Sequence, residues 1–386
     1  MRILILHNRY QQAGGEDVVF EAETQMLREK GHEVIPVEVN NDNINNPIRK
    51  IGAALSAVHS IKGCQLLEEY LRKAKPEILH VHNYFPMFSP SVFKVAHRYG
   101  VPTVHTLHNY RAICPSALFL RNGVIDETSL QYSAFHMIPK RVYQESYLGT
   151  AAVAFMIEFH KAIHTWERHV DAFIALSRFA CQKFIQAGFP SDKIHIKPNF
   201  VDEPPKLEKV YQQRVGALFV GRLSREKGVD TLLKAWQGID YPLTLIGGVN
   251  MDLPRYVKGN IRLIGRLTRE EVFLAMSKAR FLVMPSECYE GFPVTLCEAF
   301  AMKLPVIASN IGSLTELVEE GVTGYKFEPG NVEGLRHTAL KLIDSPTEAD
   351  KMGANARRKY EMSYTKERNY PQLMSIYEQA IEQYKR

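Results

Sequence analysis

The sequence predicts an α/β protein of two domains, each built on a doubly wound parallel sheet. Its 386 residues exceed one hydrophobic core of usual size and fit two domains of roughly 190 residues. Short apolar runs alternate with helical segments in both halves of the chain, which is the pattern of β-α-β units whose sheet is buried on both faces. A polar segment containing Pro198, Pro204 and Pro205 separates the halves.

In the N-terminal half, strands are predicted at RILILH (2–7), EVIPVEV (33–39), EILHVH (77–82) and PTVHTLH (102–108), and helices at 16–30 and 90–100. Residues 111–150 lack this alternation, so we expect an insertion over the cleft. A helical stretch over 151–170 then leads into another strand, DAFIALS (171–177).

The alternation restarts after the proline-containing linker. Strands are predicted within 216–223, 242–248, 261–267, 281–286, 305–309 and 324–330, with helices at 228–238, 268–279, 293–302 and 313–320. The charged tail over 346–386 has a helical pattern. We therefore expect an N-terminal domain over 1–200, a C-terminal domain over 201–365, and a final helix over 366–386 that crosses back onto the first domain.

Composition excludes several classes of protein. With 45% hydrophobic and 23% charged residues and no fixed repeat, the chain is neither disordered nor fibrous. The five cysteines are odd in number and lack a C-x-x-C pair, which favours reduced thiols in a cytoplasmic protein over disulfides or a zinc site. The net charge of +6 is spread along the chain, and we expect no nucleic-acid partner.

The stretch PSECYEGFPVTLCEAFAMKLPVIAS (285–309) is the most informative. A strand ends at Pro285, and Pro293 stands where a helix can begin without losing a hydrogen bond. The free amides and dipole of such a helix start bind anions, and Gly291 leaves room for a phosphate. Glu290 and Glu298 could bracket a nucleotide sugar; the alternative is that Glu290 caps the helix and Glu298 faces solvent.

Several segments together resemble the retaining GT-B glycosyltransferases of the GT4 family. They are EGFPVTLCEAFA with the following LPVIAS, GSLTELVEEGVTGYKFEPGN, FVGRLSREKGVDTLLKAW, KPNFVD, GRLTREEVFLAMSKARFLVMPS, and the glycine pair of HNRYQQAGGEDVV. The resemblance implies two Rossmann-like domains facing a central cleft. It also implies transfer of a sugar from a nucleoside diphosphate, UDP being our first choice, to a glycan or lipid-linked acceptor in bacterial surface polysaccharide synthesis.

The resemblance assigns roles to individual residues. Arg222 and Lys227, on the loop after a strand, would hold the donor phosphates, and Glu290 and His108 would orient the sugar. Glu298 would bind the ribose. The remaining expected donor contacts are Gly15, Asn199, Gly291, Phe292, Pro293, Val294 and Thr295.

Acceptor contacts are expected from Glu16 and Asp17, beside the glycine pair. No D-x-D motif is present, so we expect no metal ion, and no cofactor beyond the donor itself. Residues 47–73 combine apolar and basic positions at helical spacing, which fits either peripheral contact with the inner face of the membrane or a helix packed on the core.

Alternatives to these assignments concern metal binding and catalysis. His80, His82 and His105 lie on predicted strands and raise a metal site, which we set aside because no carboxylate cluster or H-E-x-x-H accompanies them. His160 and His164 share a helix face, where packing is favoured. The main rival function is a non-catalytic scaffold or sensor that binds a nucleotide sugar; a nucleotide-sugar epimerase is a second, and the missing G-x-G-x-x-G excludes a dehydrogenase.

Overall fold

The computed structural model describes residues 1–9, 14–40, 56–205, 214–252 and 259–385. The chain forms two compact units. Unit 1 comprises Met1–Arg121, Asp126–Pro198 and Asn369–Arg386, and unit 2 comprises Asn122–Ile125 and Asn199–Arg368.

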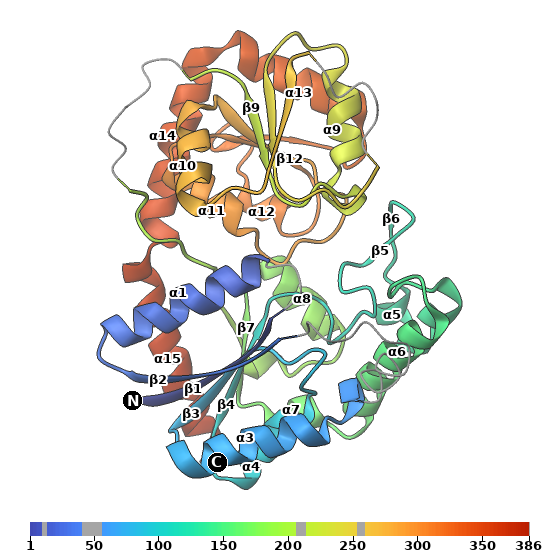
Figure 1. Ribbon diagram of the computed structural model, residues 1–386, viewed down its shortest axis with the longest axis vertical. Coiled ribbons are helices and arrows are strands. Elements are labelled where there is room, and N and C mark those ends of the chain that lie inside the picture. Colours follow the sequence, from blue (N-terminus) through green and yellow to red (C-terminus); the bar gives the residue numbers. More distant parts are fainter. Residues whose placement is uncertain (10–13, 41–55, 206–213, 253–258, 386) are drawn as a thin grey trace. The chain divides into compact units, whose positions relative to one another are not determined.

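Unit 1 is built on a six-stranded, all-parallel sheet in the order β2-β1-β3-β4-β7-β8 (Figure 1). The strands are β1 (Arg2–Arg9), β2 (Glu33–Asn40), β3 (Ile78–Asn83), β4 (Thr103–Leu107), β7 (Ala172–Ala175) and β8 (Ile194–Ile196). All six residues of β3 are buried, as expected for a central strand covered on both faces. The strands predicted in this half are present; β8 was not predicted.

The helices of unit 1 are α1 (Gly15–Glu29), α3 (Ile61–Ala74), α4 (Ser91–Arg98), α6 (Tyr147–Ala162), α7 (Thr165–His169), α8 (Arg178–Gln186) and α15 (Lys366–Tyr384). Of these, α1, α4 and α8 pack directly against strands of the sheet. In α3, Gly63, Cys64, Leu67 and Leu71 are buried, and the helix packs against α4. Within 61–73 the apolar face is therefore turned to the core, while 47–55 lie outside the described residues.

The segment 111–150 has the irregular character that its sequence indicates. It contains a short hairpin of β5 (Leu120–Arg121) and β6 (Val124–Ile125), then α5 (Thr128–Gln131) and the 3-10 helix η1 (Ala134–Lys140). The helix expected over 151–170 is two helices, because His164 adopts φ of 55° and ends the continuity between α6 and α7. His160 and His164 thus share no helix face, which corrects that expectation. His160 itself is buried and bonded to Thr165 and to the carbonyl of Val58.

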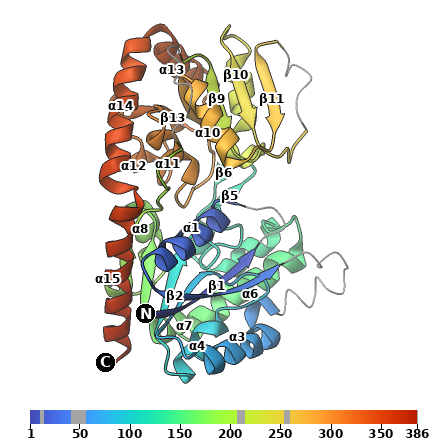
Figure 2. The same cartoon turned by 60° about the vertical axis from the view of Figure 1, so that its left-hand side comes forward.

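Unit 2 repeats the plan with a second all-parallel sheet in the order β11-β10-β9-β12-β13-β14; Figure 2 shows β10 and β11 beside β9 at one edge. The strands are β9 (Ala217–Val220), β10 (Leu243–Ile246), β11 (Ile261–Gly265), β12 (Phe281–Met284), β13 (Val306–Ser309) and β14 (Gly324–Phe327). Every strand predicted in this half is present.

The helical elements of unit 2 are η3 (Arg225–Lys227), α9 (Val229–Trp236), α10 (Arg269–Lys278), α11 (Val294–Ala301), α12 (Leu314–Leu317), α13 (Val332–Asp344) and α14 (Pro346–Ser363). Trp236, Leu245, Phe281 and Leu335 belong to one buried core formed by the sheet, α9 and α13. Among the described residues, no helix combines the length and the apolar character needed to cross a membrane.

Candidate functional site

In unit 2, the loops that carry the predicted phosphate-binding residues leave neighbouring strands. The strand order reverses between β9 and β12, and open α/β sheets bind ligands at the carboxyl edge beside such a reversal. Arg222 and Lys227 follow β9, and Glu290 follows β12. Residues 63 positions apart in sequence, Lys227 and Glu290, meet at this edge.

Lys227 and Glu290 form a tight, largely buried ion pair, with Nζ and Oε1 2.6 Å apart. Ser286 Oγ donates a second hydrogen bond of 2.6 Å to the same carboxylate oxygen. Burial opposes ionisation of both groups, but the opposite charge outweighs it, so the pKa of Glu290 is lowered and that of Lys227 is raised. Both groups are therefore charged near neutral pH.

Gly228 allows the two loops to approach closely. Its φ is 68°, and a Cβ at this position would lie 1.8 Å from the carbonyl oxygen of Pro285. The loops are joined further by a backbone hydrogen bond of 2.9 Å from Glu287 N to Glu226 O. Thr231 Oγ1 also donates to Glu287 Oε1 at 2.6 Å. The position of Lys227 relative to Glu290 is therefore fixed by backbone packing.

Arg222 differs from Lys227 in its accessibility. Its side chain is 48% exposed, and its guanidinium lies 3.4 Å from Glu226 Oε1. Such a cation is available to an anion that enters at the carboxyl edge of the sheet.

The loop after Glu290 leads directly into α11. Pro293 occupies the N-cap position with extended backbone, and the helix begins at Val294, so the expected start is displaced by one residue. Glu290 does not cap the helix, because its carboxylate is engaged by Lys227 and Ser286. Leu296 N donates to Pro293 O at 3.1 Å, whereas the amides of Val294 and Thr295 come before the first acceptor of the helix and, with Gly291 before them, offer donors to an anion.

The loop between Glu290 and α11 is held in place by Phe292, Val294 and Asn199. Phe292 and Val294 are buried, and the Phe292 ring packs edge-on against Tyr364 with centroids 5.5 Å apart. Asn199 is also buried, and its Nδ2 donates to the carbonyl of Phe292 at 3.2 Å. Pro293 and Thr295 are partly exposed beside Gly291.

Glu298 is buried in α11 and does not face solvent, which removes the alternative considered for it. Its carboxylate lies 3.4 Å from Arg269 Nε at the start of α10. Burial raises the pKa of Glu298, an effect that Arg269 partly offsets. Sequence reasoning missed Arg269, which lies in the T-R-E-E start of a helix, a pattern that indicates capping and gives no sign of this partner.

In unit 1, the first turn of α1 holds the glycine pair and two acids. Gly14 is the N-cap and Gly15 the first helical residue, and both are exposed. Both oxygens of Asp17 are engaged, Oδ1 with His7 Nε2 at 2.8 Å and Oδ2 with the amide of Gly14 at 2.7 Å. Asp17 thus fixes the start of the helix.

Glu16 is partly exposed beside the ends of β3 and β4. Its carboxylate lies 3.4 Å from Asn83 Nδ2 and 3.3 Å from Asn109 Nδ2. His108 follows β4 and, with Asn109 and Arg111, lines a small pocket at these strand ends. Its Nε2 lies 2.9 Å from His82 Nδ1, and burial holds the pKa of His108 well below its usual range.

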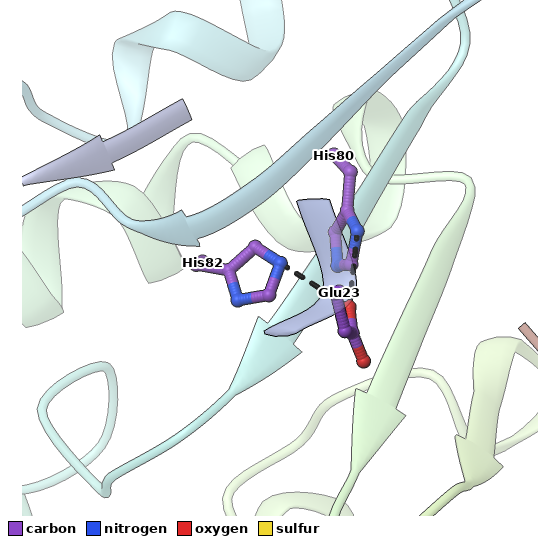
Figure 3. A group of neighbouring side chains, drawn as sticks. All are labelled: Glu23, His80 and His82. Atoms are coloured by element: carbon purple, nitrogen blue, oxygen red, sulfur yellow. Dashed lines mark ion pairs between the residues drawn. The ribbon is translucent and has the colours of Figure 1, made fainter. Parts of the chain in front are cut away.

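Glu23, His80 and His82 form a buried polar cluster (Figure 3), and His82 connects it to His108. Glu23 of α1 is close to His80 and His82 of β3, with Oε2 3.3 Å from His82 Nε2 and 3.8 Å from His80 Nδ1. A carboxylate therefore does accompany these histidines, contrary to the sequence argument, because α1 brings Glu23 across 57 or more positions of sequence. His105 lies outside the group and its Nδ1 bonds to the carbonyl of Val81 at 3.0 Å.

The cluster contains a cation of its own. Lys197, fully buried after β8, places Nζ 2.5 Å from Glu23 Oε1 and 3.0 Å from Asn369 Oδ1. Both ring nitrogens of His80 have partners, Tyr377 Oη at 2.8 Å and Thr106 Oγ1 at 2.7 Å. A metal ion would have to displace these bonds and sit beside an ammonium group, so the residues fit an ion-paired network better than a metal centre.

Comparison with known proteins agrees with this architecture. A family model described as "Glycosyltransferase Family 4" matches residues 13–203, and one described as "Glycosyl transferases group 1" matches residues 203–359. An uncharacterised glycosyltransferase of Methanocaldococcus jannaschii is 33% identical over 42% of this chain and 47% of its own length. The amylovoran biosynthesis glycosyltransferase AmsK of Erwinia amylovora is 26% identical over 54% of this chain and 56% of its own length. These alignments thus cover about half of each relative.

A solved structure, Anabaena HepE in complex with UDP, covers 97% of this chain and 99% of its own with a TM-score of 0.67 at 16% identity. At this identity the likeness shows the fold, which is the GT-B fold with its two Rossmann-like units.

Proposed function

Because this chain belongs to the GT4-type glycosyltransferases of GT-B fold, we propose that it is a retaining transferase that uses a nucleoside-diphosphate sugar. The observation that carries the proposal is the Lys227–Glu290 pair, fixed beside the exposed Arg222 and the start of α11. Cations and helix amides at the carboxyl edge of a parallel sheet suit a diphosphate.

In the proposed reaction, the bond between the sugar C1 and the diphosphate oxygen breaks while the acceptor oxygen bonds to C1 on the same face. The acceptor hydroxyl proton passes to the departing diphosphate. Negative charge grows on the diphosphate as the bond breaks, so groups that stabilise it act on the transition state. Arg222, Lys227 and the amides after Gly291 fill this role.

Lys227 can serve the diphosphate and Glu290 together. An ammonium has three hydrogen-bond donors, and Glu290 uses one of them at 2.6 Å. Glu290 thereby holds Lys227 in position, and we propose that it also orients the donor sugar. Glu298 accepts hydrogen bonds from the ribose, and Asn199 and Phe292 keep the loop in place.

Unit 1 supplies His108 for the sugar, Gly15 for close approach of the donor, and Glu16 for the acceptor. The proposed donor nucleotide is UDP, as in the complex of HepE. The proposed acceptor is a glycan or lipid-linked hydroxyl in surface polysaccharide synthesis, and the name of the Erwinia relative, which refers to amylovoran biosynthesis, supports a role in a biosynthetic pathway of this kind. No metal or other cofactor is assigned, so chelation with EDTA should leave turnover unchanged.

Calorimetric titration with a panel of UDP- and GDP-sugars tests the donor site. We expect one donor class to bind, and Lys227→Ala to weaken binding at least tenfold. The matched control is Lys234→Ala, which removes the same charge from the exposed face of α9 in the same unit. Binding of no donor would overturn the proposal, as would equal losses in the two variants.

Product detection separates the transferase from its rivals. Release of UDP together with a glycosylated acceptor is expected, and Glu290→Ala should reduce it without a comparable loss of donor affinity. Tight donor binding with no release of UDP in the presence of cell-surface glycan acceptors would instead favour a non-catalytic sensor.

A further inference from the structure

The proposed sugar-binding residue of unit 1, His108, ends a buried chain of polar contacts. Lys197 Nζ lies 2.5 Å from Glu23 Oε1, Glu23 Oε2 lies 3.3 Å from His82 Nε2, and His82 Nδ1 lies 2.9 Å from His108 Nε2. Glu23, Lys197 and His82 are almost completely buried. Four elements of unit 1 contribute: α1, β3, and the segments after β4 and β8.

The ionisation state at the buried end of the chain is set by Lys197. Burial alone would favour a neutral Glu23, but Lys197 and the neighbouring histidines outweigh it and hold the pKa of Glu23 well below its usual range. Burial lowers the pKa values of His82 and His108, an effect that Glu23 only partly offsets. The cluster is therefore one carboxylate, one ammonium and neutral imidazoles.

The position of the proton on His82 follows from hydrogen-bond satisfaction. Among the described residues, Glu23 Oε2 and His82 Nε2 form no hydrogen bond with each other or with any other group, and they approach each other to 3.3 Å as an ion-pair contact. A carboxylate oxygen can only accept, so attraction at this contact, and any hydrogen bond across it, requires the proton to be on His82 Nε2. Placing the lone pair there would leave both buried atoms unsatisfied, which costs about 1–3 kcal/mol for each.

The same reasoning gives the position of the proton on His108. If Nε2 of neutral His82 holds the proton, Nδ1 has the lone pair and must accept from His108 Nε2 at 2.9 Å. His108 then carries its own proton on Nε2. Its Nδ1 keeps the lone pair.

We propose that the buried Glu23–Lys197 pair acts through His82 to fix His108 as the Nε2–H tautomer, so that its Nδ1 is presented only as a hydrogen-bond acceptor. Glu23, Lys197 and His82 are positioning residues in this scheme. This inference rests on the proposed function. In that function, the Nε2–H tautomer makes His108 selective for a donor-sugar hydroxyl that donates a hydrogen bond.

A neighbouring branch of the cluster provides an internal control. His80 also approaches Glu23, but its two nitrogens bond to Tyr377 Oη and Thr106 Oγ1 and not to His108. Tyr377→Phe therefore disturbs the same buried region without entering the path from Glu23 to His108.

Long-range proton–nitrogen NMR on the uniformly ¹⁵N-labelled full chain tests the proposal, with signals assigned by His82→Gln and His108→Gln. In the unsubstituted protein we expect His108 to be neutral, with a proton on Nε2 and none on Nδ1. In Glu23→Gln/Lys197→Met, the glutamine side-chain amide can either accept or donate a hydrogen bond to His82. A second His108 tautomer, protonated on Nδ1, should therefore appear. In Tyr377→Phe the His108 signals should stay unchanged.

Three results would overturn the proposal. They are an Nδ1–H or charged His108 in the unsubstituted protein, an unchanged single tautomer in the double variant, or an EDTA-removable zinc ion that sets the tautomer instead of Lys197. Glu23→Gln alone leaves Lys197 buried without its partner, and the double variant avoids this because it removes both charges together.

The NMR measurement needs no donor sugar, so its outcome does not depend on whether the transferase proposal is correct. A kinetic comparison then links the two. For the UDP-sugar that the panel identifies, replacing the contacted hydroxyl by fluorine, which accepts but does not donate, should raise KM in the unsubstituted protein more than in the double variant. Equal effects in both would overturn the selectivity while leaving the donor site intact.

Discussion

Lys197 and Glu23 are buried charged residues, and burial makes each of them depend on the opposite charge of the other. Lys197 and Glu23 are each about 1% exposed and 2.5 Å apart, in the middle of unit 1. A buried charge that loses its partner must either neutralise or remain poorly solvated. The pair therefore constrains where α1, the segment after β8 and α15 can lie relative to β3.

We predict that Glu23→Gln, which leaves the Lys197 ammonium buried alone, lowers the free energy of unfolding by about 3–5 kcal/mol. Glu23→Gln/Lys197→Met should recover a large part of that loss because no uncompensated charge remains. Urea denaturation followed by circular dichroism measures both values. A double variant less stable than the single one would contradict this account.

Titration of the buried histidines predicts how stability changes with pH. Burial lowers the pKa of His105 to about 4 and that of His160 to about 4. The unfolded chain, with ordinary histidine pKa values near 6.5, then binds more protons than the folded chain between about pH 6.5 and pH 4. Stability should be full above pH 6.5 and fall as the pH drops through that window.

Each such histidine can contribute a slope of up to about 1.4 kcal/mol per pH unit. Chemical denaturation at intervals from pH 7 to pH 4 measures the slope, and His160→Gln should reduce it. The exposed His136, replaced in His136→Gln, should leave it unchanged. A slope that His160→Gln does not alter would show that this side chain is not held neutral.

At the scale of elements, the site in unit 2 depends on two strand-to-helix loops that cross at a glycine. Gly228 ends η3, caps α9, and lies against the carbonyl of Pro285, where β12 has just ended. The same contact sets the separation of Lys227 from Glu290. Substitutions here should therefore affect folding and donor binding together.

We predict that Gly228→Ala lowers stability by more than the about 1–3 kcal/mol of left-handed backbone strain, because its Cβ would also meet Pro285 O. Gly330→Ala is the matched control: its φ is 74°, but no atom lies within 4 Å of the added Cβ. Thermal melts and calorimetry with the best donor of the panel should show a larger loss of both Tm and affinity in Gly228→Ala. Equal effects would mean that strain alone governs this position.

At the scale of the whole molecule, the chain returns to its first unit at its end. Unit 1 includes residues from Asn369 onward, although the segment before them, including α14, belongs to unit 2. Within α15, Tyr377 Oη bonds to His80 and Tyr384 Oη donates to the carbonyl of His97 at 3.2 Å. Leu373, Tyr377 and Ala380 are completely buried, so α15 is part of the core of unit 1.

Truncation after Thr365 should consequently destabilise unit 1 more than unit 2. Hydrogen exchange resolved by mass spectrometry should show faster exchange in β3 and β4, with smaller changes in β9 and β12. Deletion of Lys385 and Arg386 alone should have little effect. Faster exchange confined to unit 2 would contradict this assignment.

The amino-acid sequence is enough to predict the two-unit α/β plan, because hydrophobic periodicity is local and buried parallel strands are continuous apolar runs. It also placed Arg222, Lys227, Glu290 and His108 just after strands, since polar residues that follow such runs are easily recognised. The ends and breaks of the helices were predicted less accurately. The break at His164 depends on the positive φ of one residue, and the neighbouring sequence contains no signal that predicts it.

The contacts between side chains far apart in the sequence could be read only from the folded chain. Glu23 with His82 and Lys197, and Arg269 with Glu298, come together through the order of strands in each sheet and the rotation of each helix. A buried ion pair needs both partners, yet each residue alone has the pattern of a surface charge on an amphipathic segment. Local periodicity fixes the elements, whereas pairing between elements is a property of the packed core.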